Sequence, residues 1–372
     1  MKISRQVRKQ EKLGRALGLA AGLSLVGSFG CSGSNETKDD TAGSGGTSSS
    51  AGSSSNTAGT STKGGSSSSA GTSSSSAGTS SSGGSGSGTP QLLGSFKIEV
   101  KADEGGPTTG TTSVLGKVSN GATPASVVWE EVASEGSCRL EKPRVPFCSP
   151  ACGSAVCVED DVCQAYPDGQ SVGTVTLSGV NDTGGGATLT LKEVAKAYQA
   201  PAGTTFAYPP FAEGDPVHLK ATGGDLPGFE LEARGVATLW LGDEASALES
   251  GKPLELKWTA AADPKASSVH LKLDVSHHGG SKGMIECDQD DTGSLTIPAS
   301  LMTQLLDLGV AGFPTVIVTR STTAQANVGT GVVALVVAST TEHAVTVPGV
   351  DSCTADDQCP DGETCQADLT CQ

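Results

Sequence analysis

The stretch Val269-His-Leu-Lys-Leu-Asp-Val275 decides the fold, because apolar and polar residues alternate along it without a break. Successive side chains of a β-strand point to opposite faces, so this alternation predicts a strand with one buried and one solvated face. The same pattern recurs along the chain, at residues 96–100, 175–177, 189–191, 217–219, 229–233 and 254–258. Clusters of glycine, proline, aspartate and asparagine separate these stretches and favour turns. We therefore expect an all-β protein.

The length and turn spacing of the folded part indicate its organisation. Many short strands joined by turns are typical of β-sandwiches, and a folded part that begins near residue 91 is long for one of them. We expect one or two Ig-like β-sandwiches, the first over 91–250 with a Cys-rich insert at 136–166 and the second over 251–349. A small Cys-rich acidic tail follows over 350–372. The boundary between the sandwiches is expected near Ser250-Gly-Lys-Pro253.

One helix is expected, over residues 298–309. Pro298 suits a first helical turn, the leucines that follow are spaced by four and three residues, and Gly309 ends the pattern. The stretch Cys287-Asp-Gln-Asp-Asp-Thr-Gly-Ser-Leu-Thr-Ile-Pro298 resembles the turn, strand and helical corner of many secreted bacterial Ig-like domains. That resemblance implies a fold and gives no function.

The N-terminus has the pattern of a targeting segment. Six basic residues precede residue 16, and residues 16–30 carry no charge and are rich in Leu, Ala and Gly. A basic stretch followed by a short apolar run is typical of a secretory signal peptide, which we expect over 1–30. The run is shorter than the roughly 20 residues that a membrane-spanning helix needs.

Cys31 directly follows the apolar run. The stretch Leu25-Val-Gly-Ser-Phe-Gly-Cys31 resembles the bacterial lipoprotein signal, and this resemblance implies that Cys31 becomes the first mature residue and carries lipid. In that family, a residue other than Asp directly after the lipidated cysteine implies sorting to the outer membrane, and this chain has Ser32 there. The family prefers Leu where this chain has Ser28, and Phe29 is bulkier than usual there. An ordinary secretory peptidase would instead release a soluble secreted protein, which is the alternative.

Residues 31–90 are predicted to be a lipidated, disordered linker. Ser, Gly, Thr and Ala make up almost all of residues 32–89, and the heptad at 66–72 is repeated at 73–79. Such a segment has nothing to bury that would offset the entropy of ordering it. We expect it to act as a spacer between the membrane lipid and the folded part.

The 11 cysteines argue for export. Without Cys31, ten remain and can all pair, and Cys287 is the expected sixth partner of the group at 138–163. Two stretches share a Cys-x-x-Asp-Asp-x-Cys pattern, Cys157-Val-Glu-Asp-Asp-Val-Cys163 and Cys353-Thr-Ala-Asp-Asp-Gln-Cys359, which suggests two copies of one module. The predicted disulfide residues are Cys138, Cys148, Cys152, Cys157, Cys163, Cys287, Cys353, Cys359, Cys365 and Cys371.

The pairing of these cysteines is open from the sequence, because six cysteines allow fifteen patterns. Structural zinc is the alternative to disulfides, although zinc sites favour cysteine pairs two to four residues apart and the tail has five residues between neighbours. The tail from Cys353 to Cys371 resembles short Dickkopf-type Cys-rich segments. This resemblance implies disulfides and no activity.

Composition excludes some partners and leaves little chemistry. A net charge of −16 is a poor match for nucleic acid, whose binding needs clustered Lys and Arg. The best metal-ligand candidates are His277, His278, Asp288 and Asp290, for an incidental Ca²⁺ or Zn²⁺. The alternative reading of this stretch is a solvated hairpin with histidines at a strand end. Because side chains alternate between the two faces of a strand, His218 and His270 are expected at the surface and Trp258 in the core.

The sequence contains no motif that pairs a catalytic nucleophile with a base, so we expect neither an enzyme nor a resident cofactor. The whole chain resembles lipoproteins of the myxobacterial type, which implies no particular ligand. We expect a lipid-anchored outer-membrane protein with a structural or adhesion-like binding role, facing the periplasm or the cell surface. Its partners would be membrane lipid, through the anchor, and a surface or extracellular protein or glycan. The alternative is a secreted or periplasmic metal-dependent enzyme centred on His277 and His278.

Overall fold

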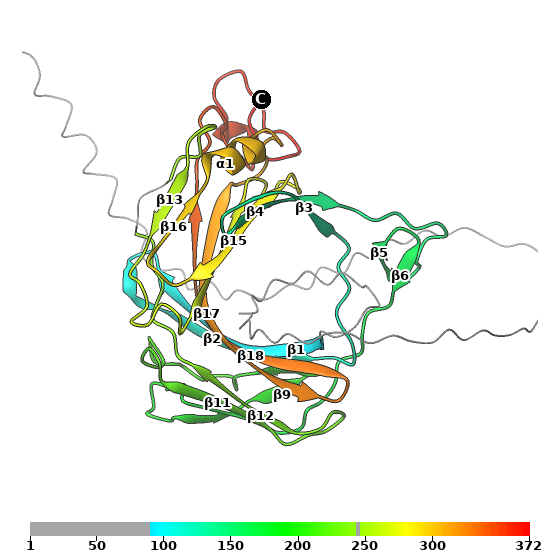
Figure 1. Cartoon of the computed structure of the whole chain (residues 1–372), viewed down its shortest axis with the longest axis vertical. Helices are drawn as coiled ribbons and strands as arrows, with labels where there is room; N and C mark the ends of the chain where they lie inside the picture. The colour runs from blue at the N-terminus through cyan, green and yellow to red at the C-terminus, as the bar shows by residue number, and fades with distance from the viewer. Residues whose placement is uncertain (1–89, 243–245) are drawn as a thin grey trace, which may run out of the picture. The chain divides into compact units, whose positions relative to one another are not determined.

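The computed structural model describes residues 90–242 and 246–372 (Figure 1). These residues form β-sheets with one α-helix, so the predicted all-β class is confirmed. The predicted signal peptide, the lipidation site Cys31 and the Ser/Gly linker lie outside the described residues.

The largest sheet has ten strands in the order β3-β4-β15-β14-β17-β18-β1-β2-β10-β9. Adjacent strands of this sheet pair antiparallel, except that β18 and β1 pair parallel. The strands are β1 (Gln91–Asp103), β2 (Gly106–Val118), β3 (Val128–Glu135), β4 (Cys138–Arg144), β9 (Lys192–Val194), β10 (Ala197–Gln199), β14 (Ser268–Asp274), β15 (Met284–Asp290), β17 (Thr315–Val328) and β18 (Gly331–Ala344).

Three smaller sheets accompany it. One has four strands in the order β12 (Phe229–Arg234), β11 (Pro216–Ala221), β7 (Val175–Ser178) and β8 (Thr188–Thr190). The others are the pairs β13 (Leu254–Lys257) with β16 (Ser294–Ile297), and β5 (Val156–Glu159) with β6 (Val162–Gln164). All the alternating stretches noted in the sequence fall in or next to these strands.

Two hydrophobic cores lie against the large sheet. In the first, Phe96 and Val337 of the large sheet pack with Leu219 and Leu231 of the four-stranded sheet, which lies beneath β1, β2 and β18 in Figure 1. In the second, the apolar residues of β14 pack with β13, β16 and the helix. Val269, Leu271, Leu273 and Val275 are all fully buried, as their alternation predicts.

The cores divide earlier in the chain than the expected boundary near Ser250. Val236 belongs to the first core, whereas Leu239 and Leu248 belong to the second. The large sheet also crosses that boundary, because six of its strands (β1 to β4, β9 and β10) precede it and four (β14, β15, β17 and β18) follow it. A boundary inferred from local turn residues cannot detect strand pairs formed by residues far apart in sequence.

The α-helix α1 (Ala299–Leu306) lies within the predicted range. Leu301, Met302 and Leu305 are its buried residues, which explains the leucine spacing, and Gly309 follows with a φ of 87°. No helix among the described residues is both long enough and apolar enough to cross a membrane.

The expectation of disulfides is confirmed. Ten cysteines form five bonds: Cys138–Cys287, Cys148–Cys157, Cys152–Cys163, Cys353–Cys365 and Cys359–Cys371. Sulfur atoms joined in this way are not available as the thiolates that structural zinc requires.

The insert and the tail form knots of the same design. In each, the first cysteine bonds the third and the second bonds the fourth. The third and fourth cysteines also face each other across a β-bridge in both knots. A residue with positive φ, Asp161 in the insert and Leu369 in the tail, stands four positions after the third cysteine.

The Asp-Asp motif occupies different loops of the two knots. It lies between the third and fourth cysteines of the insert and between the first and second cysteines of the tail. The two modules therefore have the same disulfide connectivity, but their Cys-x-x-Asp-Asp-x-Cys stretches occupy different positions within it.

Candidate binding surfaces

The histidine loop after β14 does not gather the predicted metal ligands. The rings of His277 and His278 lie 3.9 Å apart between centroids, and Nε2 of His277 is 3.8 Å from Oε1 of Glu342. In the β14–β15 hairpin, Asp274 beside this loop faces Met284. Asp288 lies four residues further along β15, about 13 Å at the rise of a strand. Asp288 and Asp290 are thus placed away from the two histidines.

Asp288 instead belongs to a charged cluster around Arg139. The guanidinium of Arg139 bonds Glu141 and Asp288, each at 2.8 Å, and also bonds Glu286. Nδ1 of His270 lies 2.8 Å from Oδ1 of Asp288. The strand register produces this cluster, because Arg139 faces Glu286 across β4 and β15, and His270 faces Asp288 across β14 and β15.

Within this cluster, each carboxylate lies close to Arg139 or His270, so opposite charges stabilise one another. Burial raises the pKa of Asp288, but hydrogen bonds from His270 and Arg139 outweigh it and leave the pKa below its usual value. Burial lowers the pKa of Arg139, but hydrogen bonds to Asp288 and Glu141 outweigh it and raise the pKa above normal. These residues clamp β4 onto β15. The alternation of apolar and polar residues correctly predicted that His270 lies on the polar side of its strand, but it did not predict which residues His270 contacts.

Arg320 and Asp291 form a buried ion pair that the sequence analysis did not anticipate. Asp291 also accepts hydrogen bonds from Nε1 of Trp258 at 2.7 Å and from Oγ of Ser267 at 2.9 Å. The remaining donors of Arg320 reach the carbonyls of Ala237 and Thr259. Trp258 is buried, so its predicted place in the core is confirmed.

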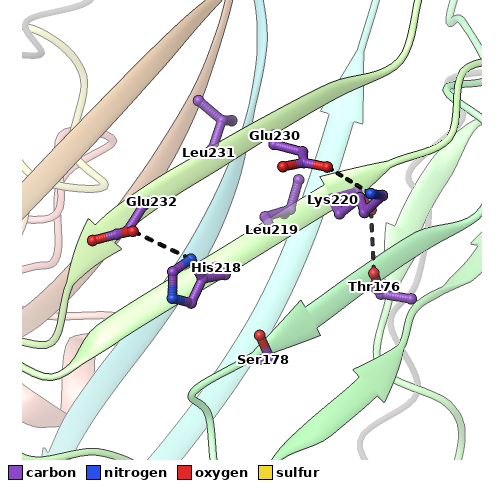
Figure 2. A pocket seen from close by; sticks show the side chains of 8 residues that line it. All are labelled: Thr176, Ser178, His218, Leu219, Lys220, Glu230, Leu231 and Glu232. Carbon is purple, nitrogen blue, oxygen red and sulfur yellow. Dashed lines mark hydrogen bonds and ion pairs between the residues drawn. The ribbon is translucent and has the colours of Figure 1, made fainter.

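The outer face of β7, β11 and β12 carries a hollow of about 430 Å³ (Figure 2). Opposite charges face each other across its strands: Lys220 lies 2.6 Å from Glu230, and His218 lies 3.4 Å from Glu232. His218 is half exposed, which confirms its predicted surface position. Each charge in the lining is therefore matched by a neighbour, as is typical of a solvated sheet face.

The Cys-rich insert exposes large apolar side chains. Val145 is 74%, Phe147 73%, Tyr166 61% and Val162 46% exposed. The two disulfides of the knot lie within this short segment. The backbone of Phe147 is fixed to the β5–β6 turn, since its N–H donates to Oδ1 of Asp160 and its carbonyl accepts from the N–H of Asp161. Exposed apolar groups on one segment make it a candidate interaction surface.

The sequence analysis treated the insert only as a source of cysteines and missed this surface. The signal was present in Cys138 to Tyr166: apolar residues follow Arg144 without the alternation that would bury half of them. A scan of protein-family models and a search of curated proteins found no match to the chain. Its function is therefore argued from its own surfaces.

Proposed function

We propose that the chain is an exported binding protein, attached to the outer membrane by lipid on Cys31, which presents a β-sandwich body and the Cys-rich insert to a partner outside the cytoplasm. The observation that carries the binding role is the exposure of Val145, Phe147, Val162 and Tyr166 on the short segment that contains the disulfides Cys148–Cys157 and Cys152–Cys163. Five disulfides support export, because such bonds persist in oxidising compartments.

The anchor rests on the sequence around Cys31. A basic segment, an apolar run and a cysteine occur in the order that lipidation requires, and the Ser/Gly-rich stretch that follows provides a spacer up to Pro90. One acyl chain holds a protein only weakly at a membrane, whereas the several chains of a bacterial lipoprotein hold it stably.

Radiolabelled palmitate tests the anchor in cells that produce the full chain. Wild type and the control Ser32→Ala should take up label and sediment with membranes, whereas Cys31→Ser should do neither. Equal labelling of wild type and Cys31→Ser, or a purified protein that begins at Met1, contradicts the proposal. Release of unlabelled wild type into the medium would identify it as the soluble secreted form.

A further inference from the structure

We propose that residues 145–166, the exposed apolar part of the Cys-rich insert, dock against an apolar segment of a partner protein that is flanked by lysine or arginine. This inference rests on the proposed binding role and names the chemistry of the partner.

Aromatic rings at the surface of this chain need an explanation, because the chain has few. It contains 7 Phe, 3 Trp and 3 Tyr. Phe96, Tyr198 and Phe229 are buried in the first core, whereas the insert exposes both Phe147 and Tyr166. Aromatic side chains dominate the energetics of protein interfaces when they enter a pocket.

The backbone beside Phe147 is held by disulfides and hydrogen bonds, which limits the entropy that this part of the segment loses on binding. Cys148–Cys157 and Cys152–Cys163 close two overlapping loops. Oδ1 of Asp161 accepts a hydrogen bond from the N–H of Ser149 at 2.8 Å, which adds to the two backbone contacts of Phe147. A segment held in one conformation loses little freedom on association, so more of its contact energy appears as affinity.

Charge selects among the possible occupants. The charged residues between Val145 and Tyr166 are Glu159, Asp160 and Asp161, with no Lys or Arg. Asp160 is bonded to Arg144 and Asp161 to a backbone N–H, and both lie at the surface with Glu159. A second copy of this chain, whose net charge is −16, and an anionic membrane would both be repelled. An apolar segment flanked by basic residues complements this surface.

The test uses the full chain in its soluble Cys31→Ser form and a phage-displayed library of random peptides as the probe. Selected peptides should combine Lys or Arg with aromatic or branched aliphatic residues. Their affinity, measured by calorimetry, should fall roughly thirtyfold for Phe147→Ser or Tyr166→Ser. Leu115→Ser is the matched control, because Leu115 is 58% exposed but lies on β2, and it should leave the affinity unchanged.

A charge variant separates the two parts of the proposal. Glu159→Gln, which leaves the hydrogen bonds of Asp160 and Asp161 intact, should weaken peptide binding severalfold and reduce its salt dependence. Intact disulfides, checked by mass spectrometry, confirm that each variant folds.

Three results would overturn the inference: no enriched peptide, peptides whose binding ignores Phe147→Ser, or peptides without basic residues. Self-association or binding to zwitterionic vesicles that is lost in Phe147→Ser would assign the surface to a second copy or to lipid, and would equally refute it. Palmitate labelling is unaffected by any of these outcomes, so failure here remains distinct from failure of the anchor.

Discussion

The carboxylate of Asp291 is fully buried, and the guanidinium of Arg320 is its countercharge. Arg320 is also buried, with 1% of its surface exposed, and it links Asp291 to the carbonyls of Ala237 and Thr259. Ala237 lies where the chain passes from the first core to the second. A charge left unpaired in such a place is costly.

Asp291→Asn should therefore lower the free energy of unfolding by about 3–5 kcal/mol, since it leaves Arg320 buried without its countercharge. Urea denaturation followed by circular dichroism measures this loss. Asp290→Asn changes the adjacent, exposed residue and should alter stability by less than about 0.5 kcal/mol. Equal effects of the two variants would show that the ion pair does not stabilise the fold.

Acid should destabilise the protein through two carboxyls, Asp288 and Asp291. Burial raises the pKa of Asp291, but hydrogen bonds from Arg320 and Trp258 outweigh it, so the folded pKa lies below normal, as it does for Asp288. The unfolded state then binds protons more readily, so the stabilisation is full above about pH 4 and is lost as the pH falls through the folded pKa values. Urea midpoints measured from neutral pH downward should drop in that window, and the drop should be smaller in Asp288→Asn. A midpoint independent of pH there would refute this assignment.

At the scale of elements, the hairpin of β3 and β4 joins the large sheet through few contacts. Only Cys138, Arg139, Leu140 and Glu141 pair with β15, and the Cys138–Cys287 bond lies at one end of that ladder. The Arg139 cluster lies beside it. Residues 145–166 follow this junction directly, so the junction positions the N-terminal end of the proposed binding surface, while Gln164 at the other end donates to the carbonyl of Ala122.

Replacing both Cys138 and Cys287 by Ala should lower the free energy of unfolding by about 2–5 kcal/mol, because the bond closes a loop with a sequence separation of 149 residues. Amide exchange in β3 and β4 should accelerate more than exchange in β11. The matched control replaces Cys359 and Cys371 in the tail, where the separation is 12 residues and the core is remote. Unchanged exchange in β4 would show that the ladder alone holds the hairpin.

The alternating stretches and the proline-to-glycine helix could be predicted because the burial of a strand or helix face is written in local periodicity. The pairing of β4 with β15 could not, since it joins residues far apart in sequence and the strand pattern does not encode a neighbour. For the same reason the Arg139 cluster could not be predicted, although the alternation places His270 on the polar face of its strand.

At the scale of the molecule, the two cores share one long strand, β17. β17 and β18, of 14 residues each, pair along their whole length, and β17 contributes Val328 to the first core and Val316 and Val318 to the second. A strand common to both cores should couple their unfolding.

We therefore expect one cooperative thermal transition, with equal calorimetric and van't Hoff enthalpies. A fragment that ends at Ser250 should fail to fold, because β1 would lack its partner β18. Removal of the tail from Asp351 onward serves as the control and should preserve the transition. Two separate transitions, or a folded fragment with dispersed amide resonances, would show that the halves are independent domains.

The parallel pairing of β1 with β18 also sets an order of events during synthesis. Gln91 of β1 faces Gly331 of β18, so the first strand of the described residues can complete its pairing only after one of the last strands has been synthesised. A polypeptide with this topology cannot close its central ladder until β18 has been made. On the proposed export route, the ladder would therefore close after translocation, in a compartment where disulfides form.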